Sequence, residues 1–135
     1  MNISFTGKTV MVTGAGAGIG AVTAKDFGSL GANVAVVDMN IDAARATSLE
    51  INANGGMSEA FACDISDETQ VANTIASIVK RFGSLDCAFN NAGIGPDGVR
   101  IPYGALTETD SSTWRKICDV NLTGTFLCLK HELIQ

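Results

Sequence analysis

The feature that most constrains the fold of this chain is a regular alternation between two kinds of apolar segment. Short runs rich in β-branched residues are typical of buried strands, and the longer segments between them carry apolar residues at helical spacing. The pattern predicts strands over residues 8–14, 33–38, 59–64 and 85–93, and helices over 18–30, 41–56, 67–82 and from residue 110 onward. Apolar strands separated by helices form parallel sheets with right-handed crossovers. The sequence therefore predicts an α/β fold, a doubly wound parallel sheet with four βα units.

Two of the predicted helices carry recognisable side-chain patterns. The third begins with a cap at Ser66 or Asp67, and Gln70 lies where a capping box with Asp67 places it. Gly83 ends this helix. Its predicted apolar face comprises Val71, Ile75, Ile78, Val79 and Phe82. For the first helix, Ile19, Val22, Phe27 and Leu30 recur at helical spacing with small residues between them, and Gly31 ends the helix.

Composition excludes several classes of protein. At 135 residues, one domain over residues 1–135 is expected, and 46% hydrophobic with 17% charged residues argues against disorder. The net charge is −5 and the nine Lys and Arg residues are scattered, so a basic nucleic-acid-binding patch is not expected. No apolar run approaches the roughly 20 residues of a membrane span, and the first residues lack a signal-peptide pattern. We expect a soluble cytoplasmic protein.

The four cysteines, Cys63, Cys87, Cys118 and Cys128, lie on apolar stretches without short paired spacing. A zinc site requires closely spaced Cys or His pairs, so no metal site is predicted. We interpret the cysteines as reduced side chains that serve as small buried hydrophobes.

The stretch TGAGAGIG, residues 13–20, places four glycines in seven positions between a predicted strand and a predicted helix. The first N–H groups of a helix face outward with the positive end of the helix dipole behind them, which favours a phosphate group. Glycines allow a ligand to approach the backbone and allow the helix to pack tightly on the strand. This turn therefore predicts a phosphate-binding site.

The glycine spacing narrows the kind of site. The pattern G-x-G-x-x-G fails from Gly14 because its last position is Ile19, whereas T-G-x-x-x-G-x-G fits Thr13, Gly14, Gly18 and Gly20. A P-loop is excluded because no Gly-Lys-Ser/Thr follows. An S-adenosylmethionine site is disfavoured because Thr13 stands where an acidic residue usually precedes the glycines.

Asp38 ends the second predicted strand, and a carboxylate there accepts hydrogen bonds from both hydroxyls of an adenosine ribose. It would repel a 2′-phosphate, and neither Ala17 nor Met39 offers a compensating cation, so NAD is favoured over NADP. The alternative role for Asp38 is to cap the next helix. Two further candidates are Asn91, whose amide can bond loop backbone, and Asn121, whose amide needs a partner on an apolar helical face.

With these residues the chain resembles the short-chain dehydrogenase/reductase family over its whole length. TGAGAGIG resembles the cofactor turn of that family, which assigns cofactor contacts to Thr13, Gly14, Gly16, Gly18, Ile19 and Gly20. CDIS is similar to its third-strand end, where Asp64 would contact the adenine amino group and Ile65 would lie beside it. NNAG supplies Asn91, Ala92 and Gly93, and VNLTG resembles the central-helix motif in which Asn121 is catalytic.

The resemblance implies a Rossmann-type domain that binds NAD and transfers hydride between nicotinamide C4 and the carbon of a small alcohol or ketone. It also implies a homo-oligomer. In the family, a tyrosine acts as general acid and base, a lysine four residues later lowers its pKa, and a serine orients the carbonyl. Asn121 would help to hold a water at that lysine.

The family tyrosine follows the central helix, whereas the single tyrosine here, Tyr103, precedes it and has Thr107 at the lysine position. We therefore expect an incomplete domain that lacks the Tyr-x-x-x-Lys half and is inactive alone. Two interpretations stay open. The chain is the cofactor-binding half of an NAD-dependent oxidoreductase, or it is a non-enzymatic nucleotide-binding or partner-binding module.

Overall fold

A sheet of four parallel strands forms the centre of the structure, a computed structural model that describes residues 3–95 and 105–135. The strands are β1 (Thr9–Thr13), β2 (Asn33–Asp38), β3 (Met57–Ala62) and β4 (Cys87–Phe89). Their order is β3-β2-β1-β4, and the pairings of β1 with β2 and β4, and of β2 with β3, are all parallel. The predicted α/β class with a parallel sheet is confirmed.

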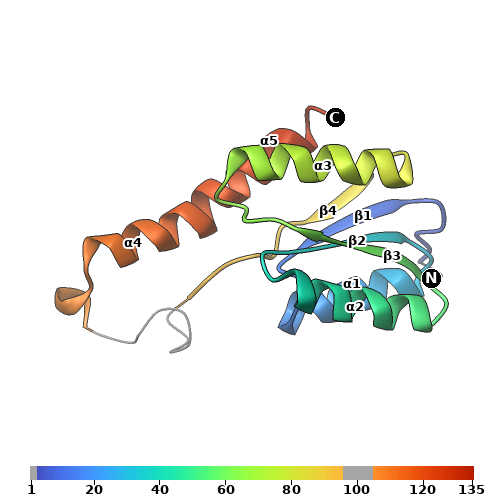
Figure 1. The fold of residues 1–135 in the computed structure, drawn as a ribbon, viewed down its shortest axis with the longest axis horizontal. Coiled ribbons are helices and arrows are strands. Elements are labelled where there is room, and N and C mark those ends of the chain that lie inside the picture. Colours follow the sequence, from blue (N-terminus) through green and yellow to red (C-terminus); the bar gives the residue numbers. More distant parts are fainter. Residues whose placement is uncertain (1–2, 96–104) are drawn as a thin grey trace.

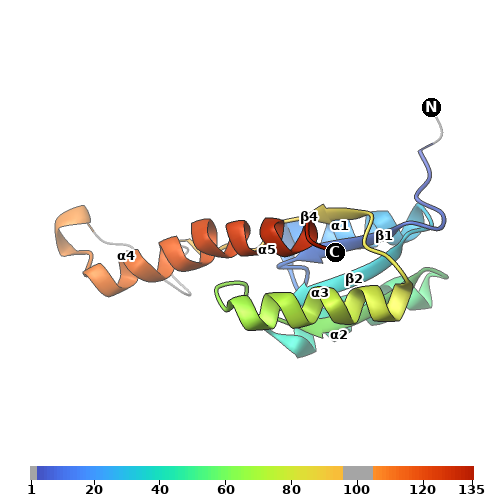
Figure 2. The ribbon, with the colours of Figure 1, turned by 90° about the horizontal axis from the view of Figure 1, so that it is seen from above.

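Helices cover both faces of the sheet, as a doubly wound fold requires (Figure 1). Helices α1 (Gly18–Ser29) and α2 (Ile41–Ala53) lie on one face, and α3 (Glu68–Phe82) and α5 (Thr125–Glu132) lie on the other. A 3-10 turn, η1 (Leu106–Glu108), precedes α4 (Ser111–Cys118), which continues through the π-helical segment η2 (Asp119–Gly124) into α5. Figure 2 shows that α4 extends beyond the sheet. Within the described residues, no helix has the length and apolarity needed to cross a membrane.

The central strands are buried on both faces because their side chains alternate between two apolar clusters. The cluster beneath α1 and α2 takes Val10 and Val12 from β1, and the cluster beneath α3 and α5 takes Met11. Strand β2 divides in the same way, with Val36 on the first side and Val37 on the second. This two-sided burial explains the near-continuous apolar strand sequences.

The predicted first helix is confirmed as α1, which packs through small residues and leaves part of its apolar residues exposed. Ile19 and Val22 are 73% and 59% exposed. The buried residues of α1 are Gly20, Ala21, Ala24 and Gly28. A Cβ atom at Gly20 would lie 2.3 Å from the Gly14 carbonyl oxygen, closer than any side chain allows. Backbone contact between helix and turn therefore displaces the larger apolar residues to the surface.

Strand β3 occupies residues 57–62 instead of the predicted 59–64, because its pairing is limited by the extent of β2. The pairing ends where Asp38 meets Ala62, after which Cys63 N–H donates to the Asp38 carbonyl. Asp64 consequently lies in the loop beyond the strand.

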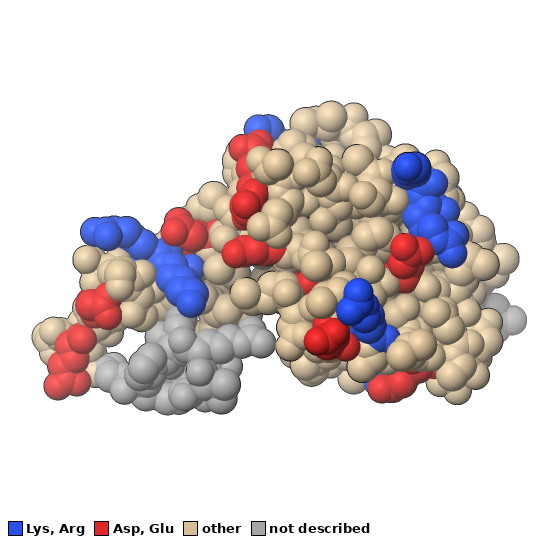
Figure 3. All heavy atoms as spheres, in the orientation of Figure 1, with Lys and Arg blue, Asp and Glu red and all other residues tan. Residues whose placement is uncertain are grey.

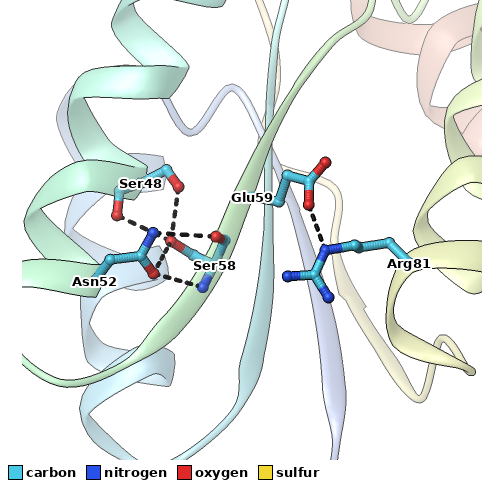
Figure 4. A network of polar contacts seen from close by, with 5 residues as sticks. All are labelled: Ser48, Asn52, Ser58, Glu59 and Arg81. Carbon is cyan, nitrogen blue, oxygen red and sulfur yellow. Dashed lines mark hydrogen bonds and ion pairs between the residues drawn. The ribbon is translucent and has the colours of Figure 1, made fainter.

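Polar contacts fix β3 to the helices on both faces (Figure 4). The Ser58 backbone N–H donates to Asn52 Oδ1 at 2.8 Å, and the hydroxyls of Ser58 and Ser48 lie 2.8 Å apart. The next residue, Glu59, forms an ion pair with Arg81 of α3. Successive side chains of β3 thus bind α2 and α3 in turn.

Helix α3 begins as predicted at Asp67, whose carboxylate accepts a hydrogen bond from Gln70 N–H. The predicted capping box was wrong in its second half, because Gln70 Oε1 accepts from Asp64 N–H at 3.0 Å and not from the cap residue. Gln70 therefore holds the loop that carries Asp64. The apolar face is confirmed for Val71, Ile75 and Ile78, which are buried, and Gly83 follows the last turn.

Strand β4 is shorter than the predicted 85–93, because polar contacts hold the chain at both of its ends. Before the strand, the Asp86 carboxylate accepts hydrogen bonds from Thr9 N–H, Ser84 Oγ and Lys8 Nζ. After it, Asn91 N–H donates to Thr13 Oγ1. The resulting strand is only three residues long.

We expect acid to weaken the fold through Asp86. The Thr9 N–H, followed by Lys8 and Ser84, lowers the pKa of Asp86 from 3.8 to about 2. Because the folded-state pKa lies below the unfolded one, this contribution is present above pH 3.8 and is lost as the pH falls toward about 2. Urea unfolding midpoints measured across this window should fall less steeply for Asp86→Asn than for the parent. Asp26→Asn on the surface of α1 is the control, and equal slopes for Asp86→Asn and the parent would contradict the assignment.

Candidate functional site

A cavity of about 520 Å³ lies where the carboxyl ends of the strands meet. Parallel α/β sheets bind ligands at this edge. Six of the predicted site residues line the cavity: Gly14, Asp38, Asp64, Ile65, Ala92 and Gly93. The opposite wall is formed by residues of α4 and η2, including Ser112, Arg115, Lys116, Asp119 and Val120.

Thr13 and Asn91 connect the glycine turn to the loop after β4. The Thr13 hydroxyl accepts hydrogen bonds from the backbone N–H groups of Asn91 and Ala92, both at 3.1 Å. Asn91 Nδ2 donates to the Thr13 carbonyl at 3.1 Å, which fulfils the expectation that its amide bonds loop backbone. Because Thr13 is buried and shares these hydrogen bonds with the loop, the side chains of Thr13 and Asn91 hold the glycine turn against the loop after β4.

The glycine turn leads directly into α1, whose first backbone N–H groups are the candidate phosphate site. Gly14 and Gly18 have φ angles of +65° and +56°, which side chains rarely adopt, and a Cβ at Gly18 would meet open space. The helix begins after Ala17, and no described side chain caps it or places an acidic group in its first turn. The N–H groups of Gly18, Ile19 and Gly20 can therefore hold an anionic group such as a phosphate. These three residues lie outside the cavity lining.

Asp38 is oriented by two backbone donors. Gly16 N–H donates to Oδ2 and Asn40 N–H donates to Oδ1, each at 2.9 Å. A carboxylate oxygen has two acceptor positions, so each keeps one for a ligand hydroxyl. The alternative role as a helix cap was wrong, because Asn40 caps α2 by accepting from the N–H groups of Asp42 and Ala43.

Asp64 and Ile65 form the floor of the cavity beside β3. Asp64 Oδ1 accepts hydrogen bonds from the backbone N–H and the hydroxyl of Ser66, at 2.9 and 2.6 Å. Ile65 is 5% exposed and lines the same cavity. The polar side chain of Asp64 and the apolar side chain of Ile65 thus adjoin in the cavity lining, which suits a heteroaromatic ring.

Asn121 lies in η2 and links the central helix to the loop after β4. Its Oδ1 accepts from Ile94 N–H at 2.8 Å, and its Nδ2 donates to the Ile94 carbonyl at 2.7 Å. The expectation that its amide has a partner is confirmed. Single π-helical turns inside α-helices occur frequently at functional sites. Asn90 instead contacts α5, where its Nδ2 donates to Glu132, and burial raises the pKa of that glutamate.

Sequence reasoning missed the cations of this site. Arg115 and Lys116 line the cavity together with Asp38, although neither is near it in sequence. The spacing of Ser112, Arg115, Lys116 and Asp119 places them on one helical face, but it does not show which part of the fold that face meets.

Other sequence expectations differ in outcome. All four cysteines are free thiols, but only Cys63 and Cys128 are fully buried. Tyr103 and the Pro- and Gly-containing loop around it lie outside the described residues.

Known proteins similar to this chain are dehydrogenases and oxidoreductases. The 2,5-dichloro-2,5-cyclohexadiene-1,4-diol dehydrogenase of Sphingobium indicum is 42% identical over 129 residues, which cover 96% of this chain and 48% of that protein. A metagenomic short-chain oxidoreductase solved in complex with NADP has a TM-score of 0.86 at 34% identity, over 99% of this chain and 57% of its own. An NAD⁺-bound xylitol dehydrogenase has a TM-score of 0.86 at 33% identity, over 97% and 48% of the two chains.

The chain spans about half the length of the curated relatives it matches. The sequence model of the short chain dehydrogenase family matches residues 8–134, nearly the whole chain, and the chain therefore belongs to that family.

Proposed function

We propose that residues 1–135 form the cofactor-binding half of an NAD-dependent oxidoreductase that acts on a small alcohol or ketone. The observation that carries this proposal is the Asp38 carboxylate, fixed by two backbone N–H groups at the edge of the cavity with one acceptor position free on each oxygen. Two vicinal hydroxyls match such a pair of acceptors.

The other site residues have roles in the same proposal. The first turn of α1, from Gly18 to Gly20, binds the pyrophosphate through backbone N–H groups. Asp64 and Ile65 bind the adenine, and Ala92 and Gly93 provide the adjoining wall without side chains that would fill it. The nicotinamide, when bound, supplies or accepts the hydride. Asn121 holds the loop after β4 against the central helix and so positions the reacting end of the site.

We expect NAD to bind more tightly than NADP, because the Asp38 carboxylate repels a 2′-phosphate. One similar solved protein is bound to NADP and another to NAD⁺, so these similarities do not decide between the two cofactors. The expected preference for NAD therefore rests on Asp38. Asp38→Ala should weaken NAD binding by about 1–3 kcal/mol, because the ribose hydroxyls would lose their hydrogen-bond acceptor and this is the usual cost of an unpaired buried polar group. Titration calorimetry with both cofactors measures this difference, and Asp42→Ala on the exposed face of α2 is the control. Equal or tighter binding of NADP by the parent would refute the preference.

The second candidate function is a non-enzymatic nucleotide-binding or partner-binding module. The observation that favours a partner-binding role is the exposed apolar surface to which Leu122, Phe126 and Leu129 of η2 and α5 contribute. NAD binding without turnover in the complete native polypeptide would support this candidate, and turnover would exclude it.

The proposed enzyme is a cytoplasmic homo-oligomer. The four free thiols are consistent with a reducing compartment. Exposed apolar side chains, such as Leu122 on η2 and Phe126 on α5, are consistent with subunit contacts.

A further inference from the structure

Helix α4 presents one polar face to the cavity. Ser112, Arg115, Lys116 and Asp119 follow helical spacing, and all four line the cavity opposite the ends of β2 and β3. No residue of α4 is buried, and Figure 1 shows this helix standing away from the sheet. Its basic side chains form a blue group at the left of Figure 3. The cavity therefore separates a rigid sheet edge from an exposed helix.

The charges on the two sides of the cavity differ. The sheet side contributes Asp38 and Asp64, whereas the α4 side contributes Arg115 and Lys116 in addition to Asp119. No ion pair between described residues involves Arg115 or Lys116. Both cations line the same cavity as Asp38, and among the described residues Arg115 Nη2 donates a 3.4 Å hydrogen bond to Ser111 Oγ.

We propose that Arg115 and Lys116 form a second binding element for the adenosine end of the cofactor, able to hold a phosphate on its ribose. Asp38 is then the group that bars such a phosphate, and the site already contains the positive charge that an NADP-binding site needs. This inference rests on the proposed function.

Two opposing interactions at one site give this arrangement its specificity. A carboxylate beside the ribose 2′ position repels a phosphate, while guanidinium and ammonium groups attract it. Charge-assisted hydrogen bonds to a phosphate are roughly twice as strong as those between neutral groups. Removing the Asp38 charge alone should therefore shift the binding preference toward the phosphorylated ribose, without a new cation next to the glycine turn.

The experiment measures the binding of 5′-AMP and of adenosine 2′,5′-bisphosphate to the full chain by calorimetry. The parent should bind 5′-AMP more tightly than the bisphosphate. Asp38→Asn should shift the affinity ratio toward the bisphosphate by about tenfold or more, the equivalent of one charged hydrogen bond. Adding Arg115→Gln and Lys116→Gln should reverse this shift. Adding Lys80→Gln, on an exposed turn of α3 outside the cavity, should leave it unchanged.

The possible failures are distinguishable. Absence of 5′-AMP binding by the correctly folded parent would refute the proposed function and the inference with it. Binding of 5′-AMP by the parent, without a gain of bisphosphate affinity in Asp38→Asn, would refute the inference alone. A gain that persists after Arg115 and Lys116 are replaced would show that other groups hold the phosphate, and would likewise overturn it.

Discussion

A polypeptide limited to residues 1–135 is expected to show no hydride transfer above background with any alcohol or ketone. The family resemblance places the general acid and base on a tyrosine that follows the central helix, with a lysine four residues later. The single tyrosine of this sequence, Tyr103, precedes that helix, and Thr107 stands at the lysine position. Loss of a general acid and base lowers the rate about 10²–10⁴-fold. The serine that orients the carbonyl in the family also has no counterpart among the family motifs found in this sequence.

Nicotinamide absorbance during incubation with a panel of small alcohols and ketones measures this activity. Calorimetric binding of NAD to the same preparation provides the control that the site is folded. Cofactor-dependent turnover that disappears in Tyr103→Phe would show that this tyrosine is catalytic after all, and would overturn the expectation.

The sequence predicted the sheet because strand apolarity is set by burial on both faces. Val10, Met11 and Val12 are buried in alternate clusters, and this leaves a continuous apolar run in the sequence. The turn motif was equally readable, because glycine is required wherever backbones approach closely, as Gly20 does to Gly14.

Two parts of the site could not be predicted from periodicity. The exposure of Ile19 and Val22 could not be predicted, because helical spacing does not show how closely a helix approaches its sheet. The cations Arg115 and Lys116 could not be predicted beside Asp38, because they are far from it along the chain. Tertiary structure brings α4 to the same cavity from the far end of the chain.

One surface of the structure is suited to contact with another copy of the chain. Leu122 of η2, Phe126 and Leu129 of α5, and Leu133 directly after α5 follow a spacing of four, three and four residues, which is typical of one helical face. They are 72%, 59%, 47% and 85% exposed. Strand β4 adds an edge, because within the described residues it pairs only with β1. Apolar surface beside an open strand edge favours intermolecular contact.

We therefore expect the 1–135 polypeptide to self-associate at micromolar concentration. Burying a Leu or Phe side chain contributes about 1.5–3 kcal/mol, so Phe126→Lys with Leu133→Lys should weaken association about a hundredfold or more. Val22→Lys with Leu49→Lys adds the same charge at exposed apolar sites on α1 and α2, and should leave association unchanged. Light scattering measures the association, and hydrogen exchange over residues 85–92 reports on the strand edge. A monodisperse parent monomer whose β4 amides are protected would show that neither the helix face nor the edge is an interface.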